Sequence, residues 1–89
     1  MIEVTDSAKE EFLQIIKENA TTDSQAMRII LTEDNELDLI LDEVEEEDYL
    51  EKNADGTTVL FIEPEIYEAL DGFKVDCTKE TGITINKES

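Results

Sequence analysis

Several residue types that commonly carry protein chemistry are missing or scarce in this chain of 89 residues. There is no histidine, which excludes imidazole acid–base catalysis and imidazole metal ligation. A single cysteine, Cys77, excludes an internal disulfide and a Cys-x-x-Cys site. Three glycines and one proline leave little backbone to wrap a cofactor, and no glycine-rich phosphate loop is present. We therefore expect no enzyme, no catalytic residue and no cofactor.

Positive charge is also scarce, with 7 bases against 25 acids, a net charge of −18 and a pI near 4.1. Such a surface repels a polyanion, so we expect no nucleic-acid binding. An acidic surface suits a basic protein partner or mimicry of nucleic acid, and it also occurs in salt-adapted proteins. The chain is rich in isoleucine and prefers lysine to arginine, which argues against salt adaptation.

Long apolar runs are absent, so no membrane span is expected, and the N-terminal residues lack the pattern of a signal peptide. We expect a cytoplasmic protein, where a lone thiol stays reduced. The apolar share of 39% includes ten isoleucines and eight leucines, enough for one small domain over residues 1–89. Four of the five aromatic residues could form an apolar interface, but in so small a domain they fit a core better, so a monomer and a homodimer both stay open; the four are Tyr49, Phe61, Tyr67 and Phe73.

Hydrophobic periodicity predicts an α+β domain, mostly β, with small mixed sheets or a sandwich and two helices in the order βαββββαββ. The first helix begins at Thr5 or at Ser7, which has capping-box spacing to Glu10, and fades at Asn19. A second, short helix opens at Glu63-Pro64 and ends before Gly72. The predicted strands cover residues 2–5, 27–32, 37–42, 49–52, 58–62, 73–78 and 83–86. Apolar residues on the polar faces of the second and third strands indicate that both faces are covered.

Five segments in this order resemble the HesB-like family, the A-type proteins of iron–sulfur cluster biogenesis. The segment after the second helix is the most similar, with a Leu-Asp-Gly-x-x-(Leu/Val)-Asp pattern at residues 70–76. The others are the opening at residues 2–8, an acidic segment at 41–48, a Gly-x-x-Val strand at 56–62 and the closing strand at 82–86. The resemblance covers nearly the whole chain and implies the family's fold and its pathway.

The resemblance does not extend to the cluster ligands. Family members that hold iron or a cluster use one cysteine in a Cys-Ser-Gly loop and two in a C-terminal Cys-x-Cys pair. The matching loop here, residues 32–36, has no cysteine, and the sequence ends at Ser89 where that pair would begin. Iron–sulfur clusters take about four thiolates, and even a dimer of this chain would supply two. We interpret the chain as a degenerate member; loss of a C-terminal pair by truncation stays open.

Two weak candidate sites remain. Glu33, Asp34, Glu36 and Asp38 offer oxygen ligands to a hard cation such as Ca²⁺, although the EF-hand spacing is absent and a solvated hairpin loop fits as well. Cys77 is a candidate reactive thiol or shared ligand, but it has the strand parity of Phe73 and Val75, which indicates a core position.

The densest acidic run, residues 43–48, is typical of a solvated connector or of a docking site for a basic partner. The only arginine, Arg28, is predicted to pair with a cross-strand acid such as Asp38 or Asp42. Together these features predict a non-catalytic binding or regulatory module linked to iron–sulfur cluster biogenesis, whose partner is a basic protein or the assembly machinery. The alternatives are an acidic interaction protein and a weak divalent-metal binder.

Overall fold

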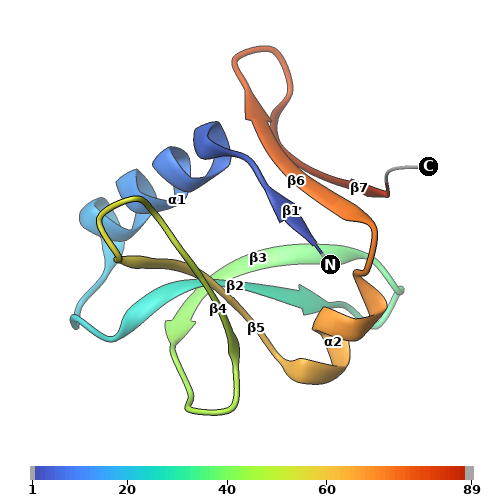
Figure 1. The fold of residues 1–89 in the computed structure, drawn as a ribbon, viewed down its shortest axis with the longest axis horizontal. Coiled ribbons are helices and arrows are strands. Elements are labelled where there is room, and N and C mark those ends of the chain that lie inside the picture. The colour runs from blue at the N-terminus through green and yellow to red at the C-terminus, as the bar shows by residue number, and fades with distance from the viewer. Residues whose placement is uncertain (1, 88–89) are drawn as a thin grey trace.

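The computed structural model describes residues 2–87, and their helices and strands follow the predicted order (Figure 1). The helices are α1 (Asp6–Asn19) and α2 (Pro64–Ala69). The strands are β1 (Glu3–Val4), β2 (Gln25–Leu31), β3 (Leu37–Glu43), β4 (Tyr49–Lys52), β5 (Thr58–Ile62), β6 (Phe73–Thr78) and β7 (Gly82–Lys87). Neither helix has the length and apolar character needed to cross a membrane.

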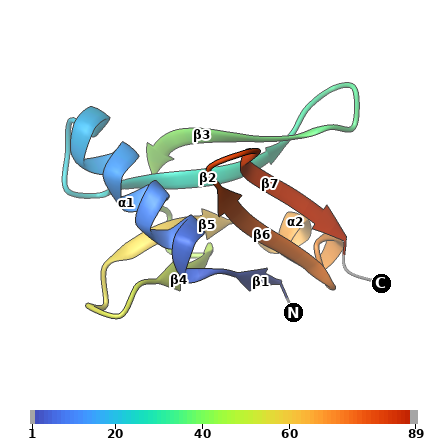
Figure 2. The same ribbon diagram turned by 90° about the horizontal axis from the view of Figure 1, so that it is seen from above.

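The strands form two mixed sheets, as predicted. One has four strands in the order β3-β2-β5-β4, and the other has three in the order β1-β6-β7. The pairs β2–β5 and β1–β6 are parallel and the remaining pairs are antiparallel. The three-stranded sheet and α1 lie on the same side of the four-stranded sheet, which Figures 1 and 2 show from two directions. We call the covered side of the four-stranded sheet its inner face and the other side its outer face.

The main core fills the space between the inner face, α1 and the three-stranded sheet. Phe12 and Ala8 of α1 are fully buried, as the helical spacing of the sequence predicts. They meet Ile29 of β2, Leu60 of β5 and Val75 of β6, none of which is exposed. Each such side chain contributes about 1.5–3 kcal/mol of hydrophobic stabilisation, so this shared core holds the two sheets together.

Helix α2 connects β5 to β6 along the chain, and an aromatic stack packs it against β4 of the four-stranded sheet. Pro64 opens the helix, and the Tyr67 ring stacks on the Tyr49 ring with centroids 4.0 Å apart. Burial, with a hydrogen bond to the Glu51 carboxylate, raises the pKa of Tyr49 to about 12. Gly72 then adopts a φ of +84°, which a side chain would disfavour, and this turn leads the chain into β6.

Thr5 fixes the start of α1, which decides between the two predicted cap residues. Its Oγ1 accepts a hydrogen bond from the Ala8 amide at 3.2 Å and donates one to Asp76 Oδ1 at 2.8 Å. The Thr5 amide donates to the Val75 carbonyl at 3.0 Å. The same residue therefore caps the helix and ties it to β6. The Thr5 hydroxyl and the Cys77 amide, with the charge of Lys74, lower the pKa of Asp76.

Replacing Thr5 with alanine tests this cap. We expect T5A to lower the free energy of unfolding by about 1 kcal/mol in urea denaturation, since an N-cap side chain is lost. The pKa of Asp76, followed by NMR, rises in T5A. Because the folded pKa of this carboxyl lies below its unfolded value, its stabilising effect is present above the unfolded pKa and is lost as the pH falls through the folded one. T5S keeps the hydroxyl and serves as the matched control; a T5S protein as unstable as T5A would contradict the assignment.

Candidate functional site

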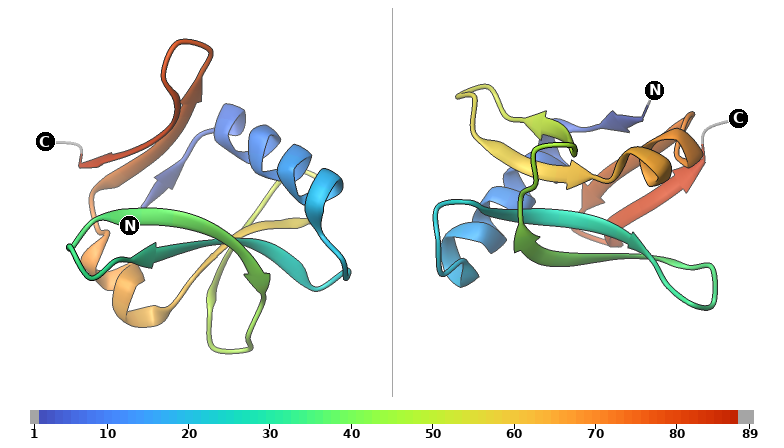
Figure 3. Two further views of the ribbon diagram at one scale, coloured as in Figure 1. Left: turned by 180° about the vertical axis from the view of Figure 1, so that it is seen from behind. Right: turned by 90° about the horizontal axis from the view of Figure 1, so that it is seen from below.

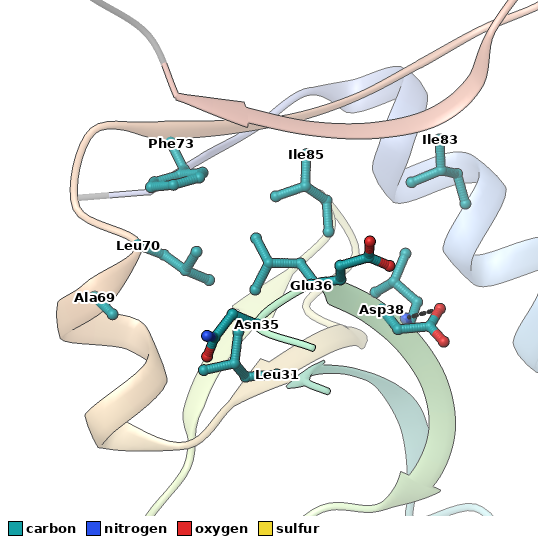
Figure 4. Close-up of a pocket in the computed structure, with 11 residues that line it drawn as sticks. Leu31, Asn35, Glu36, Asp38, Ala69, Leu70, Phe73, Ile83 and Ile85 are labelled. Carbon is teal, nitrogen blue, oxygen red and sulfur yellow. Dashed lines mark hydrogen bonds between the residues drawn. The ribbon is translucent and has the colours of Figure 1, made fainter. Parts of the chain in front are cut away.

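A groove of about 560 Å³ opens between the β2–β3 hairpin and the three-stranded sheet (Figure 4). Leu31, Leu37 and Leu39 line it from the hairpin, and Ile83 and Ile85 of β7 face them from the other sheet. The end of α2 and the start of β6 add Ala69, Leu70 and Phe73. We call this site the hairpin groove.

The groove exists because the two sheets separate where β2 ends. Register pairs Ile29 with Leu39 and Leu31 with Leu37, so all four side chains point to the inner face. Ile29 is fully buried, whereas Leu31, two residues further along the same face, is 52% exposed. The apolar core is thus continuous with an apolar surface at this end of the molecule.

The loop that forms one wall of the groove is held by its own hydrogen bonds. The Thr32 amide donates to the Glu36 carbonyl at 2.8 Å, and the Asn35 amide donates to the Thr32 carbonyl at 3.0 Å. The Glu36 amide donates to the Thr32 hydroxyl at 3.1 Å. Asn35 takes a φ of +62° at the tip, a conformation that asparagine tolerates better than most residues. The wall is therefore preformed.

The four carboxylates predicted as a cation site do not form one ligand set. Glu36 and Asp38 line the groove, and Asp38 Oδ1 accepts the Leu39 amide at 2.8 Å. Within residues 2–87, no three side chains of histidine, cysteine, aspartate or glutamate gather in a way that could hold a metal ion. The geometry gives the groove an acidic rim rather than a metal centre.

The acidic run predicted as a connector over residues 43–48 begins with Glu43, which is the last residue of β3. The remaining residues, 44–48, which we call the acidic connector, lie on the opposite, outer face of the four-stranded sheet. The connector joins β3 to β4, which are the two edge strands, and therefore crosses β2 and β5 (Figure 3). Below the crossing, one row of residues runs through the four strands in register: Ile40, Arg28, Phe61 and Leu50. Phe61 is fully buried, and the Arg28 guanidinium carbon lies 4.7 Å from the centre of its ring.

Arg28 holds the connector against this row. Its guanidinium lies 3.7 Å from Asp48 Oδ2 and 4.0 Å from Glu45 Oε1, both in the connector. It also donates a 2.8 Å hydrogen bond to Glu63 Oε1, and its Nε lies 3.6 Å from Asp42 Oδ2. The Asp48 side chain is only 2% exposed; its carboxylate accepts the Glu45 amide at 3.0 Å, and Arg28 supplies the positive charge that balances it.

Cys77 lies on β6 opposite Ile83 and packs against the main core, half-buried. Burial raises the pKa of its thiol, and the negative charges of Glu11 and Asp76 raise it further. A thiolate is the nucleophilic and metal-binding form of cysteine, so this surrounding disfavours reactivity and ligation alike.

The structure confirms one sequence interpretation, changes another and adds a feature. Arg28 pairs with the cross-strand acid Asp42, one of the two predicted, and its nearest partner, Glu63, lies outside the hairpin. The acidic connector is partly folded against the sheet instead of fully solvated. The hairpin groove was not predicted. The alternating leucines at positions 37, 39 and 41, with Leu31 before the turn, were a signal for an apolar hairpin face.

The fold resembles that of one solved iron–sulfur protein over most of its length. A structure described as the crystal structure of IscA with the [2Fe-2S] cluster matches 96% of this chain and 81% of its own, with a TM-score of 0.59 and 22% sequence identity. No family model and no curated protein matches the sequence. The chain therefore has an IscA-like fold.

The Arg28–Asp48 pair makes a quantitative prediction for stability. Replacing Arg28 with methionine removes the positive charge beside the buried Asp48 carboxylate, which then keeps only the hydrogen bond from the Glu45 amide. We expect a loss of about 3 kcal/mol in the free energy of unfolding. Adding D48N to R28M restores part of that loss because the unpaired charge is removed. Urea denaturation of the wild type, the two single variants and the double variant measures the coupling. If the two losses simply add, the pair does not hold the connector.

The raised pKa of Cys77 predicts slow alkylation. At pH 8 iodoacetamide should modify the folded protein more slowly than the urea-unfolded protein, because less thiolate is present. E11Q removes a nearby negative charge and should increase the rate, whereas E10Q on the same helix serves as the control. The folded thiol releases its proton at a higher pH than the unfolded one, so its contribution to stability is complete below the unfolded pKa and declines as the pH rises. An alkylation rate equal to that of the unfolded chain contradicts this account.

Proposed function

We propose that this protein is a non-catalytic binding module with an IscA-like fold that acts in iron–sulfur cluster biogenesis through protein contacts and carries no cluster of its own. The observation that carries the proposal is the combination of this fold with a single thiol. The fold suggests a link to iron–sulfur cluster biogenesis. The shortage of cysteine ligands suggests that the chain contacts other proteins and does not hold a cluster.

The residues present do not fit an iron–sulfur cluster. Clusters are held by thiolates, and the only thiol here is half-buried on β6 with a raised pKa. The family resemblance places ligands in the loop after residue 31 and in a C-terminal pair beyond β7. In this chain the loop has the sequence Thr32-Glu33-Asp34-Asn35-Glu36, whose side chains offer oxygen and nitrogen instead of sulfur. Such hard ligands suit iron–sulfur clusters poorly.

The surface that occupies this place in the fold favours protein binding. The hairpin loop and β7 border the hairpin groove, whose walls are apolar. An apolar groove that stays open in an otherwise highly charged small protein is typical of an interaction site.

Anaerobic reconstitution with iron and sulfide tests the ligand part of this proposal. We expect no visible chromophore and less than about 0.1 iron per protein after desalting, since two soft donors per dimer fall short of the usual four. C77S serves as the matched variant and should behave identically. A stoichiometric, sulfide-containing chromophore that disappears in C77S would show that the protein binds a cluster and overturn the proposal.

The pathway part is tested separately, by binding. Immobilised protein should bind at least one purified component of the iron–sulfur assembly machinery of its own organism saturably, and binding should weaken as salt rises. A complete set of assembly components that gives no saturable binding contradicts the link to cluster biogenesis.

A further inference from the structure

The hairpin groove combines two properties that together specify an occupant. Its walls are apolar, and Leu31 at its rim is the most exposed of the large apolar residues described, at 52%. Its volume of about 560 Å³ lies in the range of about 300–1,000 Å³ that ligand sites occupy. A site of this size accepts a few apolar side chains and not a broad protein face.

The charge around the groove selects among apolar partners. Of its lining residues in the described part of the chain, the charged ones are Glu36 and Asp38, both acids. The adjacent loop adds Glu33 and Asp34, both exposed. With a net charge of −18, the chain repels a second copy of itself and an anionic membrane. A segment that is both apolar and cationic can bury its apolar side chains against the walls and place its positive charges beside the acids.

The loop wall of the hairpin groove is also preorganised in the free protein. The hydrogen bonds of Thr32 with Asn35 and Glu36 close the loop, and the base of the groove rests on the buried core at Ile29 and Leu70. Little ordering is then needed on this side of the interface, which reduces the entropic cost of association.

We propose that the hairpin groove docks a short cationic amphipathic segment of a partner protein. Apolar side chains of the segment enter between Leu31 and Ile85, and its lysine or arginine residues lie against Glu36 and the acidic loop tip. This inference rests on the proposed function, because it assigns the protein contact to one surface and gives the chemistry of the partner.

Three labelled model peptides of about 14 residues, roughly four helical turns, test the chemistry of the occupant. The first has leucine and lysine at amphipathic spacing, the second replaces its lysines with glutamate, and the third replaces its leucines with glycine. We expect the leucine–lysine peptide to bind at least about tenfold more tightly than either comparator in fluorescence anisotropy. Equal binding by the glycine–lysine peptide means general attraction to an acidic protein and overturns the proposal, as does binding of the glutamate peptide.

Paired variants test the location. Leu31 is exposed, so L31N should fold with unchanged circular dichroism, and we expect it to weaken binding of the leucine–lysine peptide by about tenfold. L50N, an exposed leucine on the outer face, is the matched control and should stay within about twofold of the wild type. E36Q should weaken binding, and E10Q on α1 should not. An L31N protein that binds as well as the wild type overturns the proposal.

Two further outcomes separate the alternatives. If light scattering shows a wild-type dimer that L31N converts to a monomer, the occupant is a second copy and the proposal is wrong. The peptide assay and the reconstitution test fail independently. If the peptide does not bind and no cluster forms, the groove proposal is wrong and the proposed function still stands. If the peptide binds and a cluster also forms, the groove proposal stands and the proposed function is wrong.

Discussion

The arrangement of this molecule depends on one guanidinium group in a chain dominated by carboxylates. Arg28 lies almost fully buried in the middle of the four-stranded sheet, stacked on Phe61 and surrounded by acids from three segments. Without a buried cation, the connector between the two edge strands would present its acids to a sheet that carries more acids. The arginine allows the chain to cross its own outer face, and that crossing brings β4 to its place beside β5.

This arrangement gives the two faces of the sheet opposite roles. The outer face is closed by an electrostatic contact over a small aromatic centre, with Ile40 and Leu50 partly exposed at its flanks. The main apolar core covers the inner face. The core ends at Leu31, because the three-stranded sheet diverges from the four-stranded sheet there. Stability therefore comes from the buried middle of both faces, and the hairpin groove is the place where the apolar core reaches solvent.

An IscA-like fold that carries one thiol, with a raised pKa, shows that the fold and the side chains of a site are set independently. The sheets and helices place a loop and the last strand around one groove, and this placement does not depend on which side chains occupy it. In this chain, leucine, isoleucine and carboxylates occupy it. The side chains in this chain give the groove apolar walls and an acidic rim.

The sequence by itself determined the local structure: the order of strands and helices, the buried face of α1 and the turn at Gly72. It also fixed the side chains available for chemistry, with no histidine and one cysteine. These follow from periodicity, turn residues and composition, which act over a few neighbouring positions. Only the tertiary structure decided that Arg28 meets Glu63 and Asp48 and that Leu31 lies across a groove from Ile85. It also decided that Thr5 rather than Ser7 caps α1, because the Thr5 hydroxyl that accepts the Ala8 amide also donates to Asp76 on β6. The long-range contacts among these join residues 20 to 71 positions apart, and their partners depend on how the sheets pack, which no local pattern specifies.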